Sequence, residues 1–191
     1  MKNEFILKLS KAMEYKLIVI GGSAGSFHTV LDLLSKIPKN YSHTIIFCLH
    51  RLKSVRKGFV EALNAKSSKT VIEPNDKDLI EPGNIYLSPS NYHLFVNNDH
   101  SFSLSTEDVV NHSRPSIDFA FSSAGSVFRE NSVGILLSGA NRDGSAGLKS
   151  MEDSGSMIII QNPTDCQVDT MPNFAIESTS KYILLNSCEI V

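Results

Sequence analysis

The segment Leu17-Ile-Val-Ile-Gly-Gly-Ser-Ala-Gly-Ser26 constrains the fold of this chain more than any other feature. A run of β-favouring apolar residues leads into a serine framed by glycines, and a helical pattern begins directly after it. The spacing Gly21-x-Ser23-x-Gly25 is that of a tight strand-to-helix turn that presents a serine hydroxyl. Glycine suits such a turn because a Cβ would block the backbone angles and close approaches it needs. The segment therefore predicts an α/β unit with Ser23 at the carboxyl end of a strand.

Strand and helix patterns alternate along the rest of the chain. Buried strands are expected at 16–21, 44–49, 70–73, 133–137 and 157–161, and helices at 27–37, 55–63, 116–129 and 145–153. Shorter elements are expected as strands at 84–88, 93–96 and 102–105, a helix opening at Met171-Pro172, and an edge strand at 181–185. This order predicts an α/β fold: a doubly wound, mostly parallel sheet with helices on both faces and a small antiparallel hairpin near the C-terminal strand edge.

Length and composition are those of one ordinary globular domain. The chain has 191 residues, of which 41% are hydrophobic and 20% charged, with a formal net charge of −2. A nucleic-acid partner is not expected, because it requires a basic stripe. The three cysteines are scattered, so neither a disulfide framework nor a metal site is expected, and no apolar run is long enough to insert into a membrane. Residues 1–14 are interpreted as an N-terminal helix or linker stub, and 15–191 as the domain.

Three polar residues follow expected strands directly. Ser23 follows the first strand, His50 the second, and Asp143 lies in the glycine-rich loop after 133–137. Functional groups gather beyond the carboxyl ends of parallel strands, so these three side chains are expected to converge. A nucleophile, a base and a carboxylate that orients the base are the requirements of acyl transfer. The chain order Ser–His–Asp differs from the Ser–Asp–His order of the α/β-hydrolases.

Several motifs in the same order resemble the catalytic domain of the chemotaxis receptor methylesterases, the CheB family. The resemblance covers roughly 16–180. It rests on Ile20-Gly-Gly-Ser-Ala-Gly25, Leu49-His50, Pro82-Gly-Asn-Ile-Tyr-Leu-Ser-Pro-Ser90, His93, His112-Ser-Arg-Pro-Ser-Ile-Asp118, Gly134-Ile-Leu-Leu-Ser-Gly-Ala-Asn-Arg-Asp-Gly144, Ala146-Gly147, Gln161-Asn162 and Met171-Pro172.

The resemblance implies a function for residues 15–191. It implies hydrolysis of γ-glutamyl methyl esters on receptor signalling helices, and often deamidation of receptor glutamines. Ser23 would be the nucleophile, His50 the general base and Asp143 its orienter, with no metal or organic cofactor. The implied partners are the cytoplasmic helices of methyl-accepting receptors, together with a receptor methyltransferase or a separate response regulator, in the cytoplasm. Members typically carry an N-terminal receiver domain, which residues 1–14 are too short to hold, so a stand-alone domain is expected.

The chain departs from the family pattern near the proposed site. Ala24 replaces the usual threonine after the nucleophile, and Ala140 replaces the methionine of a Thr-Gly-Met loop. Ala24, Ala140 and Asn141 are expected as neighbours of the active site and its oxyanion-binding groups. Because a backbone N–H survives replacement of its side chain, an oxyanion hole is still expected. Arg51 adds a charge directly after the proposed base.

Other interpretations stay open at this level. Asp143 is also a candidate cap for the helix that follows it, and Arg114 and Ser116 are candidates for positioning a loop and capping a helix. A dinucleotide-binding module is disfavoured, because residue 20 is isoleucine where the glycine fingerprint needs glycine. Two alternatives remain: a methylesterase-like binding module that has lost catalysis, and a hydrolase of a different ester or amide.

Overall fold

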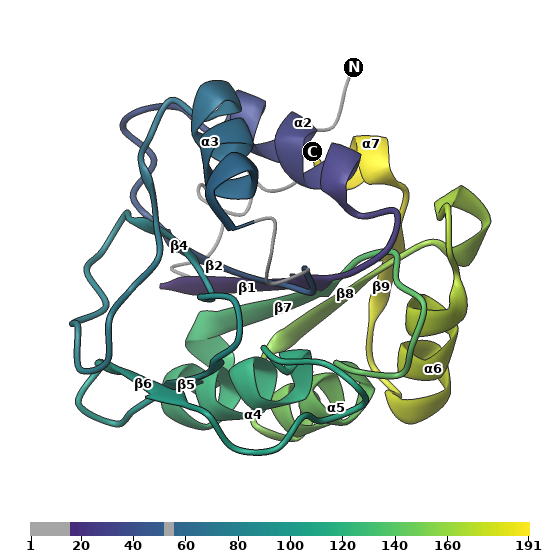
Figure 1. Cartoon of the computed structure of the whole chain (residues 1–191). Coiled ribbons are helices and arrows are strands. Elements are labelled where there is room, and N and C mark those ends of the chain that lie inside the picture. The colour runs from purple at the N-terminus through teal and green to yellow at the C-terminus, as the bar shows by residue number, and fades with distance from the viewer. Residues whose placement is uncertain (1–15, 52–55) are drawn as a thin grey trace.

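The fold is built on one parallel sheet. The computed structural model describes residues 16–51 and 56–191. Its seven-stranded sheet has the order β3-β4-β2-β1-β7-β8-β9, and every neighbouring pair is parallel (Figure 1). The strands are β1 (Leu17–Gly22), β2 (Thr44–Leu49), β3 (Val71–Ile72), β4 (Ile85–Leu87), β7 (Ser132–Leu136), β8 (Met157–Gln161) and β9 (Ile183–Leu185). The strand order steps outward in both directions from β1, which puts the carboxyl ends of β2, β1 and β7 side by side.

Helices cover both faces of this sheet (Figure 1). One face carries α2 (Phe27–Lys36), α3 (Arg56–Lys66) and the short α7 (Ser187–Ile190). The other carries α4 (Ile117–Phe128), α5 (Ser145–Asp153) and α6 (Thr170–Ser178). Two short 3₁₀ turns, η2 (Arg129–Asn131) and η3 (Pro163–Asp165), connect elements. The antiparallel hairpin of β5 (His93–Val96) and β6 (Phe102–Ser105) packs against α4 and beside β4, where the rings of Tyr86 and Phe102 are 4.8 Å apart.

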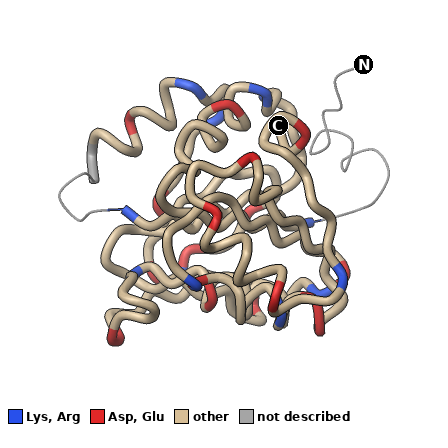
Figure 2. Tube along the Cα trace, turned by 90° about the vertical axis from the view of Figure 1, so that its right-hand side faces the viewer, with Lys and Arg blue, Asp and Glu red and all other residues tan. Residues whose placement is uncertain are grey.

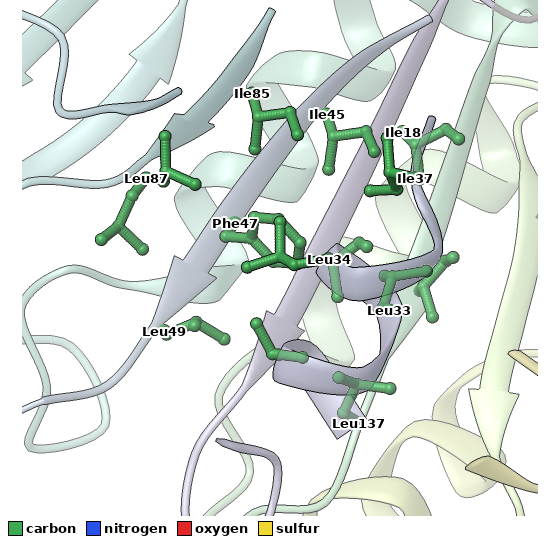
Figure 3. Close-up of a cluster of buried hydrophobic side chains, with 14 of the residues drawn as sticks. Ile18, Leu33, Leu34, Ile37, Ile45, Phe47, Leu49, Ile85, Leu87 and Leu137 are labelled. Atoms are coloured by element: carbon green, nitrogen blue, oxygen red, sulfur yellow. The ribbon is translucent and has the colours of Figure 1, made fainter. Parts of the chain in front are cut away.

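Two apolar cores follow from the alternation of side chains along the strands. On β1, Ile18 and Ile20 face the α2 side, while Leu17 and Val19 face the α4 side. Figure 3 shows the first core, in which Leu33 and Leu34 of α2 lie against the strand side chains. Because both faces of the strands are buried, their sequences read as continuous apolar runs rather than alternating ones.

Helices α4 and α5 approach each other closely through glycines. A Cβ at Gly147 would lie 2.6 Å from the carbonyl oxygen of Asp118, and one at Gly125 would lie 2.9 Å from the Cα of Met151. Both distances are shorter than real Cβ contacts, and both partners are backbone atoms that cannot rotate away. This crossing brings the N-termini of the two helices together at the carboxyl edge of the sheet.

The predicted α/β architecture is confirmed, but the hairpin was expected near the C-terminal strand edge and instead packs beside β4 and α4, away from β9 at the other edge of the sheet. The expected spans 44–49, 93–96, 102–105, 145–153 and 157–161 coincide with elements of the structure, and the others differ by a few residues at their ends. The sequence reading missed α7, although Asn186 and Glu189 form a capping box at its start. The interpretation of residues 1–14 lies outside the described residues. In the part of the chain that the structure describes, no helix is long and apolar enough to cross a membrane.

The α4–α5 crossing yields a stability prediction. Gly147→Ala should lower the free energy of unfolding by about 2 kcal/mol or more, because the added methyl meets backbone, even though alanine is the better helix former by about 1 kcal/mol. Gly58→Ala in α3 is the matched control, since nothing lies within 4 Å of a Cβ there, and it should stabilise the protein. Urea unfolding of both variants checks this; stability changes of the same sign would contradict the close-packing argument.

Candidate active site

Ser23 sits directly beyond β1, in a turn held from two sides. Its N–H donates to the carbonyl of Ser138 at 2.9 Å, and its own carbonyl accepts the hydroxyl of Ser26 at 2.7 Å. Gly25 has a φ of +85°, and a Cβ there would lie 2.5 Å from the Ser138 hydroxyl. The turn therefore needs glycine at 25 for both its conformation and its packing. It fixes Ser23 between the ends of β1 and β7.

His50 occupies the matching position on the neighbouring strand. Gly22 of β1 pairs with Leu49 of β2, and the N–H of His50 donates to the carbonyl of Gly22 at 3.1 Å. Ser23 and His50 are therefore the first residues beyond two adjacent strands in the same register. Such strands run about 4.8 Å apart, so the two residues lie side by side.

Asp143 reaches His50 from the loop after β7. Its Oδ2 lies 2.7 Å from Nε2 of His50, and the carboxylate is fully buried, while 10% of the imidazole is exposed. The same carboxylate accepts the N–H of Ile117 at 2.7 Å, the N–H of Asp118 at 3.1 Å and the hydroxyl of Ser116 at 3.0 Å. Asp143 therefore holds both His50 and the first turn of α4.

The sequence left open whether Asp143 caps the helix that follows it, which is α5. The structure shows that it caps α4 instead, since its acceptors face Ile117 and Asp118. Burial would raise the pKa of Asp143, but the hydrogen bonds from His50 and the N–H of Ile117 outweigh burial and hold the pKa below its ordinary value. The carboxylate is thus ionised at neutral pH and acts only as an acceptor.

Asp118 in turn caps the N-terminus of α5. Its Oδ1 accepts the N–H of Gly144 at 2.9 Å and of Gly147 at 2.8 Å. Its pKa is raised to about 6, chiefly by burial and also by the nearby charge of Asp143, against the lowering effect of these two N–H donors. Asp143 therefore caps α4, which contains Asp118, and Asp118 caps α5, which begins just after Asp143. Of the two carboxylates, Asp143 keeps its charge more readily.

Of the three expected neighbours, Asn141 contacts Asp143 directly. Asn141 fixes the loop, because its Oδ1 accepts the N–H of Asp143 at 3.1 Å and its Nδ2 donates to the carbonyl of Asn111 at 2.9 Å. Ala24 and Ala140 are exposed. Their N–H groups form no hydrogen bond with any residue in the described ranges, so both are available as donors.

The charged side chain of Arg51 contacts residues other than His50. Its side chain is 2% exposed and pairs with Glu73. It also donates to the carbonyl of Ser88 at 2.9 Å, and its guanidinium lies 5.3 Å from the ring centroid of Phe59. Within the described segments Arg51 makes no hydrogen bond to His50.

Three further residues near the site have structural roles, and for Ser116 and Arg114 the sequence predicted them. His93 is buried, with Nδ1 accepting the N–H of Ser116 at 3.1 Å. The hydroxyl of Ser116 caps α4 by accepting the N–H of Phe119, as expected. Arg114 donates to the carbonyls of Thr106 and Glu107 and so holds a loop.

The sequence reading missed two residues that contact this site. Ser113 places its hydroxyl 3.1 Å from Nδ1 of His50, and Asp118 anchors the loop that carries Asp143. Both fall within the segment His112-Ser-Arg-Pro-Ser-Ile-Asp118, which was singled out as a motif, so its position was a usable signal. Nothing in the sequence says which side chain of that segment faces the base.

The fold and the site define a class: α/β proteins that present a serine, a histidine and an aspartate at the carboxyl edge of a parallel sheet. The family model described as CheB methylesterase matches residues 18–190. The chain belongs to the CheB methylesterase family, as the sequence motifs predicted.

Named relatives agree with this assignment. A putative protein-glutamate methylesterase/protein-glutamine glutaminase of Leptospira interrogans is 35% identical over 90% of both chains. A protein-glutamate methylesterase/protein-glutamine glutaminase of Agrobacterium fabrum is 36% identical over 85% of this chain and 47% of its own length. The crystal structure of the Thermotoga maritima CheB methylesterase catalytic domain superposes with a TM-score of 0.84 at 27% identity, covering 93% of this chain and 96% of that one.

The two aspartates predict a pH-dependent stability. Because the folded pKa of Asp118 lies above its ordinary value of 3.8, its ionised form destabilises the fold, and this loss grows as the pH rises from about 4 to about 6. Asp118→Asn keeps an oxygen acceptor but removes the ionisation. Relative to wild type, the variant should therefore be more stable at a pH of about 7.5 than at about 4, by on the order of 1 kcal/mol after allowance for partial exposure.

Urea unfolding at both pH values measures this difference. Asp99→Asn is the control with the opposite sign, because hydrogen bonds from Ser101 lower the pKa of Asp99. It should lose stability at neutral pH and little at low pH. A difference for Asp118→Asn that is equal at both pH values, or reversed, would contradict the role of its burial.

Proposed function

We propose that this protein hydrolyses γ-glutamyl methyl esters on methyl-accepting receptor proteins, with Ser23 as nucleophile, His50 as general base and Asp143 as its orienter. The observation that carries the proposal is the 2.7 Å hydrogen bond between His50 Nε2 and the buried Asp143, one strand away from Ser23. Membership of the CheB methylesterase family supports the reaction class. The names of the relatives add protein-glutamine deamidation as a second reaction of the same site.

The order of bond changes follows from the arrangement of the ring nitrogens. Nε2 of His50 donates its proton to ionised Asp143, so Nδ1 carries the lone pair that accepts a proton. The Ser23 hydroxyl attacks the ester carbonyl carbon while its proton passes to Nδ1, and methanol leaves with that proton as the acyl-enzyme forms. A water then repeats the sequence and releases the glutamate carboxylate. Asp143 stays ionised and stabilises the imidazolium.

The negative charge that develops on the ester carbonyl oxygen during attack needs hydrogen-bond donors that are already in position. The N–H groups of Ala24 and Ala140, two exposed residues, are the proposed donors, one beside Ser23 and one in the loop that carries Asp143. Neither depends on a side chain, so the loss of the family's threonine and methionine leaves both in place. We propose that these replacements alter the fit of the substrate instead.

The proposed substrate indicates where the protein acts and which partners it meets. Methyl-accepting receptors present their modified glutamates on cytoplasmic helices, so we propose a cytoplasmic location and a receptor helix as the partner. A receptor methyltransferase or a separate response regulator would act on the same system. Figure 2 shows that Lys and Arg are interspersed with Asp and Glu along the chain rather than gathered in one region.

A binding module without catalysis is the second candidate. It is favoured by one observation: in the structure the hydrogen bonds of the His50 ring go to Asp143 and Ser113, and the Ser23 hydroxyl makes none with His50 among the described residues. Covalent labelling of Ser23 by a fluorophosphonate distinguishes the two candidates, because only an activated serine reacts.

Removing the nucleophile or the base should abolish turnover. We expect Ser23→Ala and His50→Ala each to lower methanol release from a methylated receptor cytoplasmic fragment by about a thousandfold or more, with unchanged circular dichroism. Ser126→Ala, an exposed serine on α4, is the matched control and should keep full activity. Turnover retained in Ser23→Ala would rule out this serine as the nucleophile.

Asp143 should differ from Ser23 in its effect on stability. In Asp143, Oδ2 accepts from His50 and the N–H of Ile117, and Oδ1 accepts from the Ser116 hydroxyl and the N–H of Asp118. Asp143→Asn replaces one of these oxygens by an NH₂ group, so in either orientation two donors lose their acceptor and the free energy of unfolding should fall by about 1–3 kcal/mol. It should also reduce turnover, but less than Ser23→Ala, because nucleophile and base remain. Thermal melts and methanol release together test this; an Asp143→Asn variant of wild-type stability would refute the capping role.

A further inference from the structure

Nδ1 of His50 is the nitrogen on which the proposed chemistry depends. The other ring nitrogen, Nε2, is committed to Asp143 at 2.7 Å. Because that carboxylate is ionised and accepts from Nε2, the neutral imidazole carries its proton on Nε2 and its lone pair on Nδ1. An imidazole nitrogen has one in-plane lone pair, so Nδ1 accepts one well-aligned hydrogen bond at a time.

That lone pair is already used in the structure. The hydroxyl of Ser113 lies 3.1 Å from Nδ1 and, since Nδ1 has no proton, the hydroxyl is the donor. Asn141 Nδ2 approaches the same hydroxyl oxygen at 3.4 Å, on the side of the loop that carries Asp143. With Ser23 as the proposed nucleophile, its hydroxyl would compete with that of Ser113 for this single acceptor.

A dedicated turn brings Ser113 to this position. Val110 and Ser113 are joined by two backbone hydrogen bonds, of 3.1 Å and 2.8 Å, across a two-residue turn. The central residues, Asn111 and His112, have φ values of 48° and 65°, the left-handed conformation that such a turn requires. Asparagine and histidine tolerate this conformation better than most side chains do.

The turn is also tied to the loop that carries Asp143. Asn141 Nδ2 donates to the carbonyl of Asn111 at 2.9 Å, while Asn141 Oδ1 accepts the N–H of Asp143. Ser113 and Asp143 thus approach opposite nitrogens of one ring from segments that are fastened to each other. The position of Ser113 is fixed by the same contacts that fix the orienting carboxylate.

We propose that Ser113 is a positioning residue that holds the base in a resting arrangement. Its hydroxyl occupies Nδ1 in the free protein, and Ser23 gains the base only when that hydrogen bond is released. The inference rests on the proposed function, because it presumes that Ser23 is the nucleophile. This role is not that of a second nucleophile, because the Ser113 hydroxyl keeps its proton throughout. It only changes its hydrogen-bond acceptor, whereas Ser23 transfers its proton to Nδ1.

The resting contact is tested without any substrate. In ¹⁵N spectra of the histidine rings, Ser113→Ala should shift the Nδ1 resonance of His50, Ser113→Thr should leave it close to wild type, and Ser23→Ala should move it little. The reverse pattern, with Ser23→Ala moving Nδ1 and Ser113→Ala leaving it, would overturn the proposal. Circular dichroism of each variant verifies the fold.

The functional consequence is tested by the rate of fluorophosphonate labelling, with the labelled serine mapped by mass spectrometry. Ser113→Ala should label at Ser23 about fivefold faster than wild type, the equivalent of one net hydrogen bond of about 1 kcal/mol. Ser113→Thr, which retains the hydroxyl, should restore the slower rate.

Each other outcome has a separate meaning. Labelling at Ser23 that is equal or slower in Ser113→Ala overturns the competition and leaves the proposed function standing. Labelling at Ser113 in the wild type makes it the nucleophile and overturns its positioning role. Absence of any serine label, in the wild type and in Ser113→Ala alike, overturns the proposed function and this inference with it.

Discussion

The buried carboxylate of Asp143 is the group on which both the site and the packing around it depend. It accepts a hydrogen bond from His50 and, with the same two oxygens, from the first turn of α4. An ionised carboxylate without partners would be costly to bury, and these donors from several segments compensate that cost. The imidazole of His50 is consequently oriented by a helix terminus as well as by a loop, which makes its position more rigid than a loop alone would.

The reciprocal capping of α4 by Asp143 and of α5 by Asp118 explains how these two helices pack. Asp118 caps α5 while Asp143 caps α4, so the helix N-termini must lie side by side, and glycine at 147 permits the approach. Two carboxylates this close cannot both be equally stable as anions. The pKa of Asp143, which contacts His50, is lowered, while burial, helped by the nearby charge of Asp143, raises the pKa of Asp118 to about 6. The pKa values of the two carboxylates therefore diverge because burial dominates at Asp118, whereas hydrogen bonds from His50 and Ile117 outweigh burial at Asp143.

The imidazole of His50 links the proposed reaction to the loop at 110–113. Its Nε2 is committed to Asp143, and Nδ1 faces the hydroxyl of Ser113 in the structure. The base of a serine hydrolase needs a free lone pair at the moment of attack, and elsewhere in the cycle that lone pair can rest on another donor. A turn with two consecutive left-handed residues is a specific way to supply that donor.

The sequence by itself determined the sheet, the helices and the neighbourhood of Ser23 and His50. Apolar runs long enough to be buried on both faces specify parallel strands, and parallel strands bring their carboxyl ends to one edge. Only the tertiary structure decided that Asp143 caps α4 rather than α5, that Arg51 pairs with Glu73, and that Ser113 reaches His50. Local patterns record how a segment folds, because propensity and periodicity act over a few residues. Contacts between segments far apart in the chain depend on how finished elements pack, which no local pattern contains.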